Sequence, residues 1–201
     1  MRRSPLAAFA GVFVVTLLSL VAVGAVLPVL PHYVRGPLGS GNFAVGLVIG
    51  AFAFTALACR PLAGHFSDLR GRRPVVVVGS LLAAAAGVLY FVPAGLPGLL
   101  LARLVLGAGE GMVFTAGATW VVDLAPPDRR ARVIGLYGLA VWSGLSLGPP
   151  IGDALLRASS FDAVWAFTAI APFVGALVAL RIPDPFRPVH TKERRQLVAR
   201  E

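Results

Sequence analysis

Six apolar blocks, each about as long as a transmembrane helix, limit most strongly what this chain can fold into. They cover roughly residues 8–30, 43–63, 74–92, 98–122, 133–156 and 163–182, with short connections between them. A helix needs about 20 predominantly apolar residues to cross a bilayer. Of the 201 residues, 57% are hydrophobic and 13% are charged, about half the charged share of a soluble domain. The sequence therefore predicts an all-α membrane protein with six transmembrane helices.

The basic residues indicate how these spans are oriented. Most of them lie before the first block, between the second and third, between the fourth and fifth, and after the sixth. The intervening connections hold only Arg35 and Arg157. Connections rich in lysine and arginine stay on the cytoplasmic side, so both termini are predicted to be cytoplasmic in a multi-pass protein of the cell (plasma or inner) membrane. Because topology accounts for the net charge of +9, we expect no nucleic-acid partner.

The two ends of the chain and its cysteine content add further expectations. Residues 183–201 are predicted to be a basic cytoplasmic tail, either a helix on the anionic membrane surface or a frayed terminus. The first apolar run is too long for a signal peptide, so we expect an uncleaved first span. Cys59 is the only cysteine, which leaves no internal disulfide and no cysteine metal cluster. We expect neither a metal nor a cofactor.

A short charged segment from Gly64 to Pro74 lies between the second and third spans and predicts a tight cytoplasmic hairpin. We expect Asp68 to accept hydrogen bonds from the free amides that start the third span. We expect Arg72 and Arg73 to pair with Asp68 or with phosphate headgroups. The pattern G-x-x-x-D-x-x-G-R-R resembles motif A of the major facilitator superfamily of transporters. Its members here are Gly64, Asp68, Gly71, Arg72 and Arg73.

The resemblance implies that this hairpin is a latch between two transporter halves, and that its breaking accompanies opening to the inside. The family usually has a basic residue directly after the aspartate. Leu69 stands there in this chain, and Arg70 follows it. The third charge of the latch is therefore expected on a different face.

The fourth span contains two ionisable residues, Arg103 and Glu110. Each costs about 2.5–3.5 kcal/mol in a membrane helix unless it is paired or hydrated. Their spacing places them on one helix face, about two turns apart. That placement favours a common polar cavity, although Arg103 can also extend to the outer surface.

The same segment is similar to motif B of this superfamily, with Arg103 as the motif arginine and Gly107 as the glycine that follows it. The resemblance implies a role for Arg103 in proton coupling. Glu110 lies outside the core of that motif. We infer from its burial in an apolar span that it loads and releases protons.

Glycine and proline recur in the fifth span. The order resembles motif C, G-x8-G-x3-G-P-x2-G-G, at every place but the last, where Asp153 replaces glycine. The matching residues are Gly135, Gly144, Gly148, Pro149 and Gly152. These residues predict a kinked helix in close contact with a neighbour, and the family resemblance implies a drug–proton antiporter. Glycine pairs spaced by four, at Gly46/Gly50, Gly107/Gly111 and Gly144/Gly148, also predict tight helix packing.

Together the resemblances imply one half of a major facilitator fold, built from two three-helix inverted repeats. They imply proton-coupled efflux of a small-molecule substrate, with the proton as the coupling ion and no enzymatic activity. Family members have a second six-span half, so we expect a missing C-terminal half or a homodimer partner within the lipid bilayer. A non-transporting membrane interaction protein and an inactive truncated fragment are the alternatives.

Other classes of six-span protein fit this sequence less well. A serine protease in the membrane needs a histidine at membrane depth, but His32, His65 and His190 all fall in predicted loops. A metalloprotease needs an H-E-x-x-H pattern, and none is present. The membrane half of an ATP-driven exporter usually has long cytoplasmic helix extensions, whereas the connections here are short and no P-loop is present.

Overall fold

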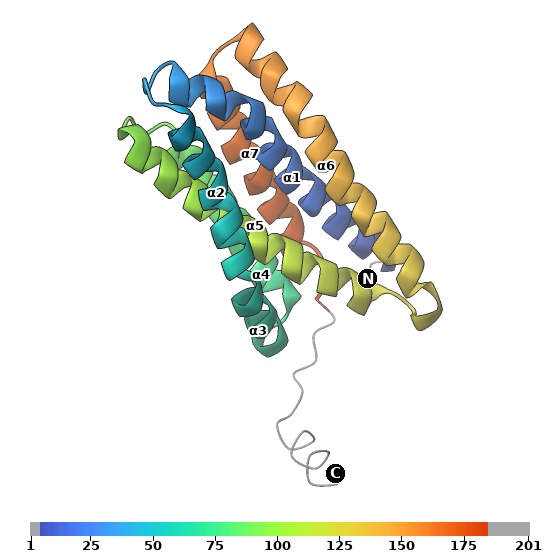
Figure 1. The fold of residues 1–201 in the computed structure, drawn as a ribbon. Helices are drawn as coiled ribbons and strands as arrows, with labels where there is room; N and C mark the ends of the chain where they lie inside the picture. Colours follow the sequence, from blue (N-terminus) through green and yellow to red (C-terminus); the bar gives the residue numbers. More distant parts are fainter. Residues whose placement is uncertain (1–4, 185–201) are drawn as a thin grey trace.

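Seven α-helices and one short 3₁₀ helix make up residues 5–184, the part of the chain that the computed structural model describes (Figure 1). They are α1 (Pro5–Arg35), α2 (Asn42–Ala58), α3 (Arg60–Arg70), α4 (Arg72–Leu89), α5 (Gly95–Leu124), η1 (Pro127–Arg129), α6 (Arg130–Ala158) and α7 (Phe161–Leu180). Within these residues six stretches are long and apolar enough to cross a membrane, because α2 and α3 together form one of them. The predicted all-α fold with six transmembrane helices is confirmed.

Helices α2 and α3 form one span because the chain stays helical between them. The backbone of Cys59 is α-helical, and its amide donates to the Thr55 carbonyl. Residues 64–70 were predicted to be a loop, and that prediction is wrong because they form the last turns of α3. The chain reverses at Gly71 alone, with a φ of 95°. Residues with a side chain rarely adopt this conformation, so glycine is needed there.

Two prolines of α6 and two histidines lie inside helices. Helix α6 runs without a break through Pro149 and Pro150, which neighbouring helices in a membrane bundle make tolerable. His32 and His65 were predicted in loops, but they lie in the last turn of α1 and in the middle of α3.

The connections between helices fall at two opposite ends of the bundle (Figure 1). We call one of them the Gly71 end; it holds the α3–α4 turn, the connection from α5 through η1 to α6, and the last residues of α7. The other, the Gly95 end, holds the α1–α2, α4–α5 and α6–α7 connections. Most of the predicted basic tail, residues 185–201, lies outside the described residues.

The helices pack in a pattern that repeats between the two halves of the chain. Helix α1 packs against α6 and α7, and helix α5 packs against α2 and α4. Exchanging α1 with α5, α2 with α6 and α4 with α7 converts the first set of contacts into the second. This relation is the one that two three-helix repeats require. In Figure 1 α4 and α7 lie behind the other helices, α2 and α6 lie on opposite sides of α1, and α5 crosses α2.

Glycines allow the closest helix contacts. On α6, Gly144, Gly148 and Gly152 all face α1: a Cβ atom added at Gly148 would lie 2.5 Å from the Cα of Gly24, and one added at Gly152 would overlap the Ala25 backbone. Gly107 and Gly111 on α5 face α2 in the same way. The other predicted pair, Gly46 and Gly50, has no described neighbour within 4 Å of such an atom, nor has Gly135. The packing prediction is therefore wrong for Gly46 and Gly50 within the described bundle.

The buried core divides into two hydrophobic clusters, one toward each end of the bundle. The cluster near the Gly95 end surrounds Trp165, and the cluster near the Gly71 end surrounds Trp120. Polar and small residues separate the two clusters: Thr16 and Ser19 interrupt the apolar series of α1, and Glu110 interrupts that of α5. We call this level of the bundle the middle layer.

Two spans expose most of their apolar surface. Helices α2 and α6 are the least buried of the six spans, and they present large side chains such as Phe43, Phe54 and Trp142 to the outside. Surface of this kind has to be covered by lipid or by another helix. The two helices flank α1 and α5, so one face of the bundle lacks an outer layer of helices among the described residues (Figure 1).

Candidate functional site

Arg103 lies completely buried between α5 and α2. Its Nε donates a hydrogen bond of 3.1 Å to the Val48 carbonyl, and its guanidinium carbon lies 4.6 Å from the centre of the Phe52 ring. Its two terminal nitrogens have no hydrogen-bond partner among the described residues. Of the two placements that the sequence left open, the structure therefore shows burial within the bundle and not extension to the outer surface.

The approach of α2 to α5 explains how the arginine reaches this position. Gly107 lies one turn beyond Arg103, and a Cβ atom there would overlap the backbone of Phe52 and the hydroxyl of Thr55. Thr55 also donates a hydrogen bond of 2.8 Å to the Leu104 carbonyl. Because Gly107 has no side chain, the backbones of α2 and α5 approach each other closely. This approach brings the Phe52 ring and the Val48 carbonyl to the Arg103 guanidinium.

Glu110 is also buried, but its contacts are with α1. Ser19 donates a hydrogen bond of 2.5 Å to one carboxyl oxygen of Glu110, and the other oxygen has no partner among the described residues. Only 4% of Glu110 is exposed. Seven residues along a helix correspond to about 10 Å, and no described hydrogen bond or ion pair joins Glu110 to Arg103. The two residues share one helix, but they contact different neighbours.

Three polar residues that the sequence reasoning did not select complete the middle layer. Thr16 donates a hydrogen bond of 3.3 Å to the Tyr137 hydroxyl, which in turn donates one of 3.2 Å to the Phe114 carbonyl. Ser19 holds Glu110, as described above. The available signal was the spacing of Thr16 and Ser19 in an otherwise apolar block, because residues three apart share one helix face.

Arg60 is a fourth residue that the sequence reasoning missed. It is an exposed arginine inside the second span, and its guanidinium carbon lies 4.8 Å from the centre of the Phe114 ring. The signal was present, because Arg60 falls within the second apolar block and not in a connection. It was overlooked because, apart from Arg103, only arginines in the connections were considered.

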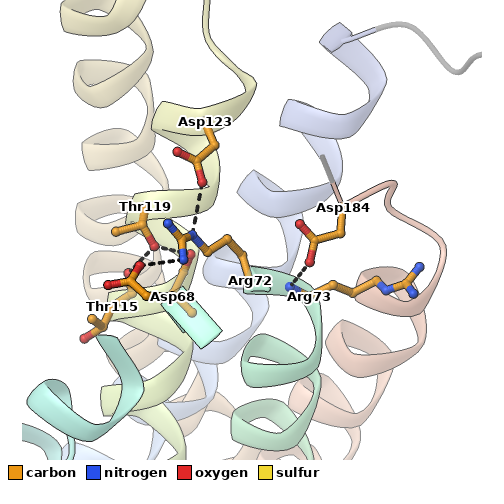
Figure 2. A network of polar contacts seen from close by, with 8 residues as sticks. Asp68, Arg72, Arg73, Thr115, Thr119, Asp123 and Asp184 are labelled. Carbon is orange, nitrogen blue, oxygen red and sulfur yellow. Dashed lines mark hydrogen bonds and ion pairs between the residues drawn. The ribbon is translucent and has the colours of Figure 1, made fainter. Parts of the chain in front are cut away.

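A polar network closes the Gly71 end (Figure 2). The guanidinium of Arg72 donates from Nη1 to Asp68 at 2.8 Å and from Nε to Asp123 at 3.0 Å, which ties α3 and α4 to α5. Asp68 does not cap the third span as expected, because no described hydrogen bond joins its carboxylate to an amide in the first turn of α4. The Arg73 amide instead donates to Asp184, at 2.9 Å.

Replacing Arg72 with lysine is expected to weaken this network. A guanidinium reaches both carboxylates through two different nitrogens, whereas an ammonium cannot reproduce that fork. Both acids are largely exposed, so we expect a loss of only about 0.5–1 kcal/mol in the free energy of unfolding. Thermal unfolding at low and high salt would measure it. Arg70→Lys in the neighbouring turn is the control, and an equal loss in both variants would contradict the assignment.

The glycines of α6 that match motif C, which we call the glycine series, differ in what they contact. Gly144, Gly148 and Gly152 carry the α1–α6 contact, whereas Gly135 meets nothing. Asp153, at the place where the pattern has a glycine, pairs with Arg157 one turn later at 2.9 Å. Among the described residues no group of three histidine, cysteine or carboxylate side chains is arranged to hold a metal ion.

Known proteins resemble this chain in both sequence and fold. A family model described as Major Facilitator Superfamily matches residues 12–200. An uncharacterised MFS-type transporter of Burkholderia mallei (strain SAVP1) is 34% identical over 183 residues, which are 87% of this chain and 45% of that protein. The chain therefore spans less than half the length of this relative.

Two solved structures have the same arrangement of helices. A peptide transporter in complex with sulfate matches with a TM-score of 0.78 at 18% identity, over 96% of this chain and 43% of that one. A human organic anion transporter matches with a TM-score of 0.76 at 22% identity, over 92% of this chain and 49% of that one. At such low identities the likeness concerns the fold alone.

Proposed function

This chain belongs to the major facilitator superfamily, and on that premise we propose that it exports small molecules across the cell (plasma or inner) membrane in exchange for protons. Its six-helix bundle is one half of the family's fold, and transport is the activity of the family. The proposed direction rests on the glycine series of α6, which resembles that of drug–proton antiporters. Three of its glycines form the α1–α6 contact.

The surroundings of Glu110 are the observation that supports proton coupling. A carboxyl group in the middle of a span is costly while it is charged, and it becomes tolerable when it is protonated. One oxygen of Glu110 accepts a hydrogen bond from Ser19, and the other has no described partner. A proton can therefore be added to the second oxygen without breaking an existing contact. Arg103, two turns away, supplies a fixed positive charge in the same helix.

A second six-helix half is part of the proposal. The chain spans 45% of its relative from Burkholderia mallei, and α2 and α6 expose large apolar side chains. We assign that surface to a C-terminal half or to a second copy of this chain. The same exposed surface favours the alternative of a membrane interaction protein that does not transport. The DNA downstream separates these cases, because six further spans there would supply the missing half.

The orientation of the bundle follows from charge. The Gly71 end carries the arginines around the α3–α4 turn and in η1 and the start of α6. By the positive-inside rule this end is cytoplasmic. The network of Asp68, Arg72 and Asp123 then acts on the cytoplasmic side as the latch that closes against the second half.

Replacing Glu110 with glutamine is the test of coupling. The amide oxygen keeps the hydrogen bond from Ser19, but the group no longer takes up a proton. We expect proton flux driven by substrate to fall to the level of protein-free liposomes, while thermal unfolding is unchanged. The measurement uses the chain with its completing half in proteoliposomes that contain a pH-sensitive dye. Panels of organic anions, cations and neutral compounds serve as substrates.

Asp153→Asn is the matched control, because Asp153 is an acid that pairs with Arg157 near the Gly95 end and lies away from the middle layer. We expect its proton flux to equal that of the wild type. Persistent coupled flux in Glu110→Gln would reject Glu110 as the proton carrier. Absence of flux with every panel in the wild type would reject transport and favour the interaction protein.

A further inference from the structure

A pocket of about 520 Å³ lies at the Gly71 end, where the end of α3 and the start of α4 meet the end of α7. Its charged lining residues are Arg70, Arg73 and Asp184, and its apolar ones include Val77, Val78 and Leu180. The volume is within the range of about 300–1,000 Å³ that is usual for ligand pockets. This lining suits a molecule that has both an anionic and an apolar part.

The two arginines of this pocket lie outside the network of Asp68, Arg72 and Asp123. Both are exposed, and neither side chain forms an ion pair or a hydrogen bond with another described residue. In Figure 2 the side chain of Arg73 extends away from that network. The sequence left two partners open for Arg73, an acid or a phosphate headgroup. Arg72 pairs with Asp68, so the headgroup stays available to Arg73.

Asp184 limits the charge that the pocket can accept. Its carboxylate accepts a hydrogen bond of 2.9 Å from the Arg73 amide, which joins the start of α4 to the segment after α7. Two arginines and one aspartate leave the lining with a formal excess of one positive charge. A phosphodiester carries one negative charge, and its oxygens match the planar donors of arginine.

Apolar side chains continue from the pocket along two helices that pack against each other, α4 and α7. Val78 and Leu180 line the pocket, and Leu81 and Leu177 lie about one turn deeper in the spans. Residues three apart on a helix are neighbours on its surface. All four side chains are exposed. They extend the apolar wall of the pocket toward the middle of the bundle.

The position of the pocket favours lipid as its occupant. Helices α4 and α7 lie behind the other helices in Figure 1, whereas the surface that we assign to a second half belongs to α2 and α6. Residues 185–201 carry more basic than acidic side chains, so they complement two arginines poorly. Basic pockets between membrane helices on the cytoplasmic side bind anionic lipid headgroups.

We infer that this pocket binds one anionic phospholipid, with its phosphodiester at Arg70 and Arg73 and its acyl chains along the exposed apolar faces of α4 and α7. The site goes beyond the proposed transport function and does not depend on it. The bound lipid would contact the α3–α4 turn and the end of α7 together, and so link two parts of the bundle that are distant in the sequence.

Native mass spectrometry tests the site, because the mass of a retained lipid identifies it. The chain with its completing half, in detergent, is mixed with equal amounts of phosphatidylglycerol, phosphatidylethanolamine and phosphatidylcholine. We expect phosphatidylglycerol to be retained about tenfold more often than either zwitterionic lipid, as arginines near a phosphate allow. Arg70→Gln and Arg73→Gln should each lower this preference to about threefold, and the double variant should abolish it.

Arg130→Gln is the matched control, since Arg130 is an exposed arginine at the same end of the bundle and does not line this pocket. It should leave the preference intact, and thermal unfolding would show that every variant is folded. Equal retention of phosphatidylglycerol and either zwitterionic lipid, or an unchanged preference in the double variant, overturns the inference.

A second arm of the experiment separates a lipid from a soluble phosphate ester. Glycerophosphoglycerol, the same headgroup without acyl chains, is added at the concentration of the lipid. We expect it to displace almost no phosphatidylglycerol, because it lacks the chains that contact α4 and α7. Displacement of half of the lipid would assign the pocket to a soluble anion and reject the lipid. Neither arm uses a gradient or a cargo, so both results are independent of the transport proposal.

Discussion

Replacing Gly152 with alanine is expected to lower the free energy of unfolding by about 1–3 kcal/mol, the range for overpacked sites. The added methyl group would overlap the carbonyl group of Ala25, a backbone atom that no rotamer change can move aside. Helices α1 and α6 must separate to accommodate it, and that contact is the most extensive one that α1 makes. Thermal unfolding in nanodiscs, followed by tryptophan fluorescence, measures the change.

Gly135→Ala is the control for this prediction. It belongs to the same series on the same helix, but an alanine there meets nothing within 4 Å. Because alanine stabilises a helix relative to glycine, we expect a gain of up to about 0.5–1 kcal/mol. Similar effects in the two variants would mean that the α1–α6 contact does not depend on its glycines.

Replacing Arg103 with leucine is expected to abolish coupled transport while the bundle stays folded. The change removes one hydrogen bond and one cation–π contact with Phe52, the latter worth about 0.5–2 kcal/mol. It also removes two buried donors that have no described partner, each costing about 1–3 kcal/mol. These effects oppose each other, so the unfolding temperature should change little. Substrate-driven proton flux in proteoliposomes should nevertheless fall to the protein-free level.

Arg157→Leu is the control for Arg103→Leu. Arg157 is an exposed arginine that pairs with Asp153 near the Gly95 end, and its loss should leave proton flux unchanged. Normal flux in Arg103→Leu would reject a coupling role for Arg103. A large fall in unfolding temperature would instead show that Arg103 mainly holds α2 against α5.

The sequence predicted the parts of this fold that depend on local composition. Six apolar blocks are visible because a bilayer requires long runs, and glycines such as Gly148 stand out by their spacing. Residues 64–70 were misassigned because their charge suggested a loop, although nothing in them prevents a helix from extending out of the membrane. The helix ends only at Gly71, where the chain reverses and φ is positive.

The site was predicted less completely, because its contacts join helices that are distant in the chain. Arg103 and Glu110 were identified because charge in an apolar span is costly and unusual, and Arg103 also from its resemblance to motif B. Their partners, the Val48 carbonyl and Ser19, follow only from how α2 and α1 pack on α5. Arg60 was missed because, apart from Arg103, only the arginines in the connections were considered.

The division of the core into two clusters has a consequence for how the bundle can move. Each cluster surrounds its own tryptophan, Trp165 or Trp120, and the buried polar side chains of Ser19 and Glu110 lie between them. Water that reaches Ser19 and Glu110 would leave most of both clusters buried, so it costs little hydrophobic free energy. The transport cycle proposed above requires water to enter the centre of the bundle and leave it again, and this division of the core keeps most of the apolar burial intact while that happens.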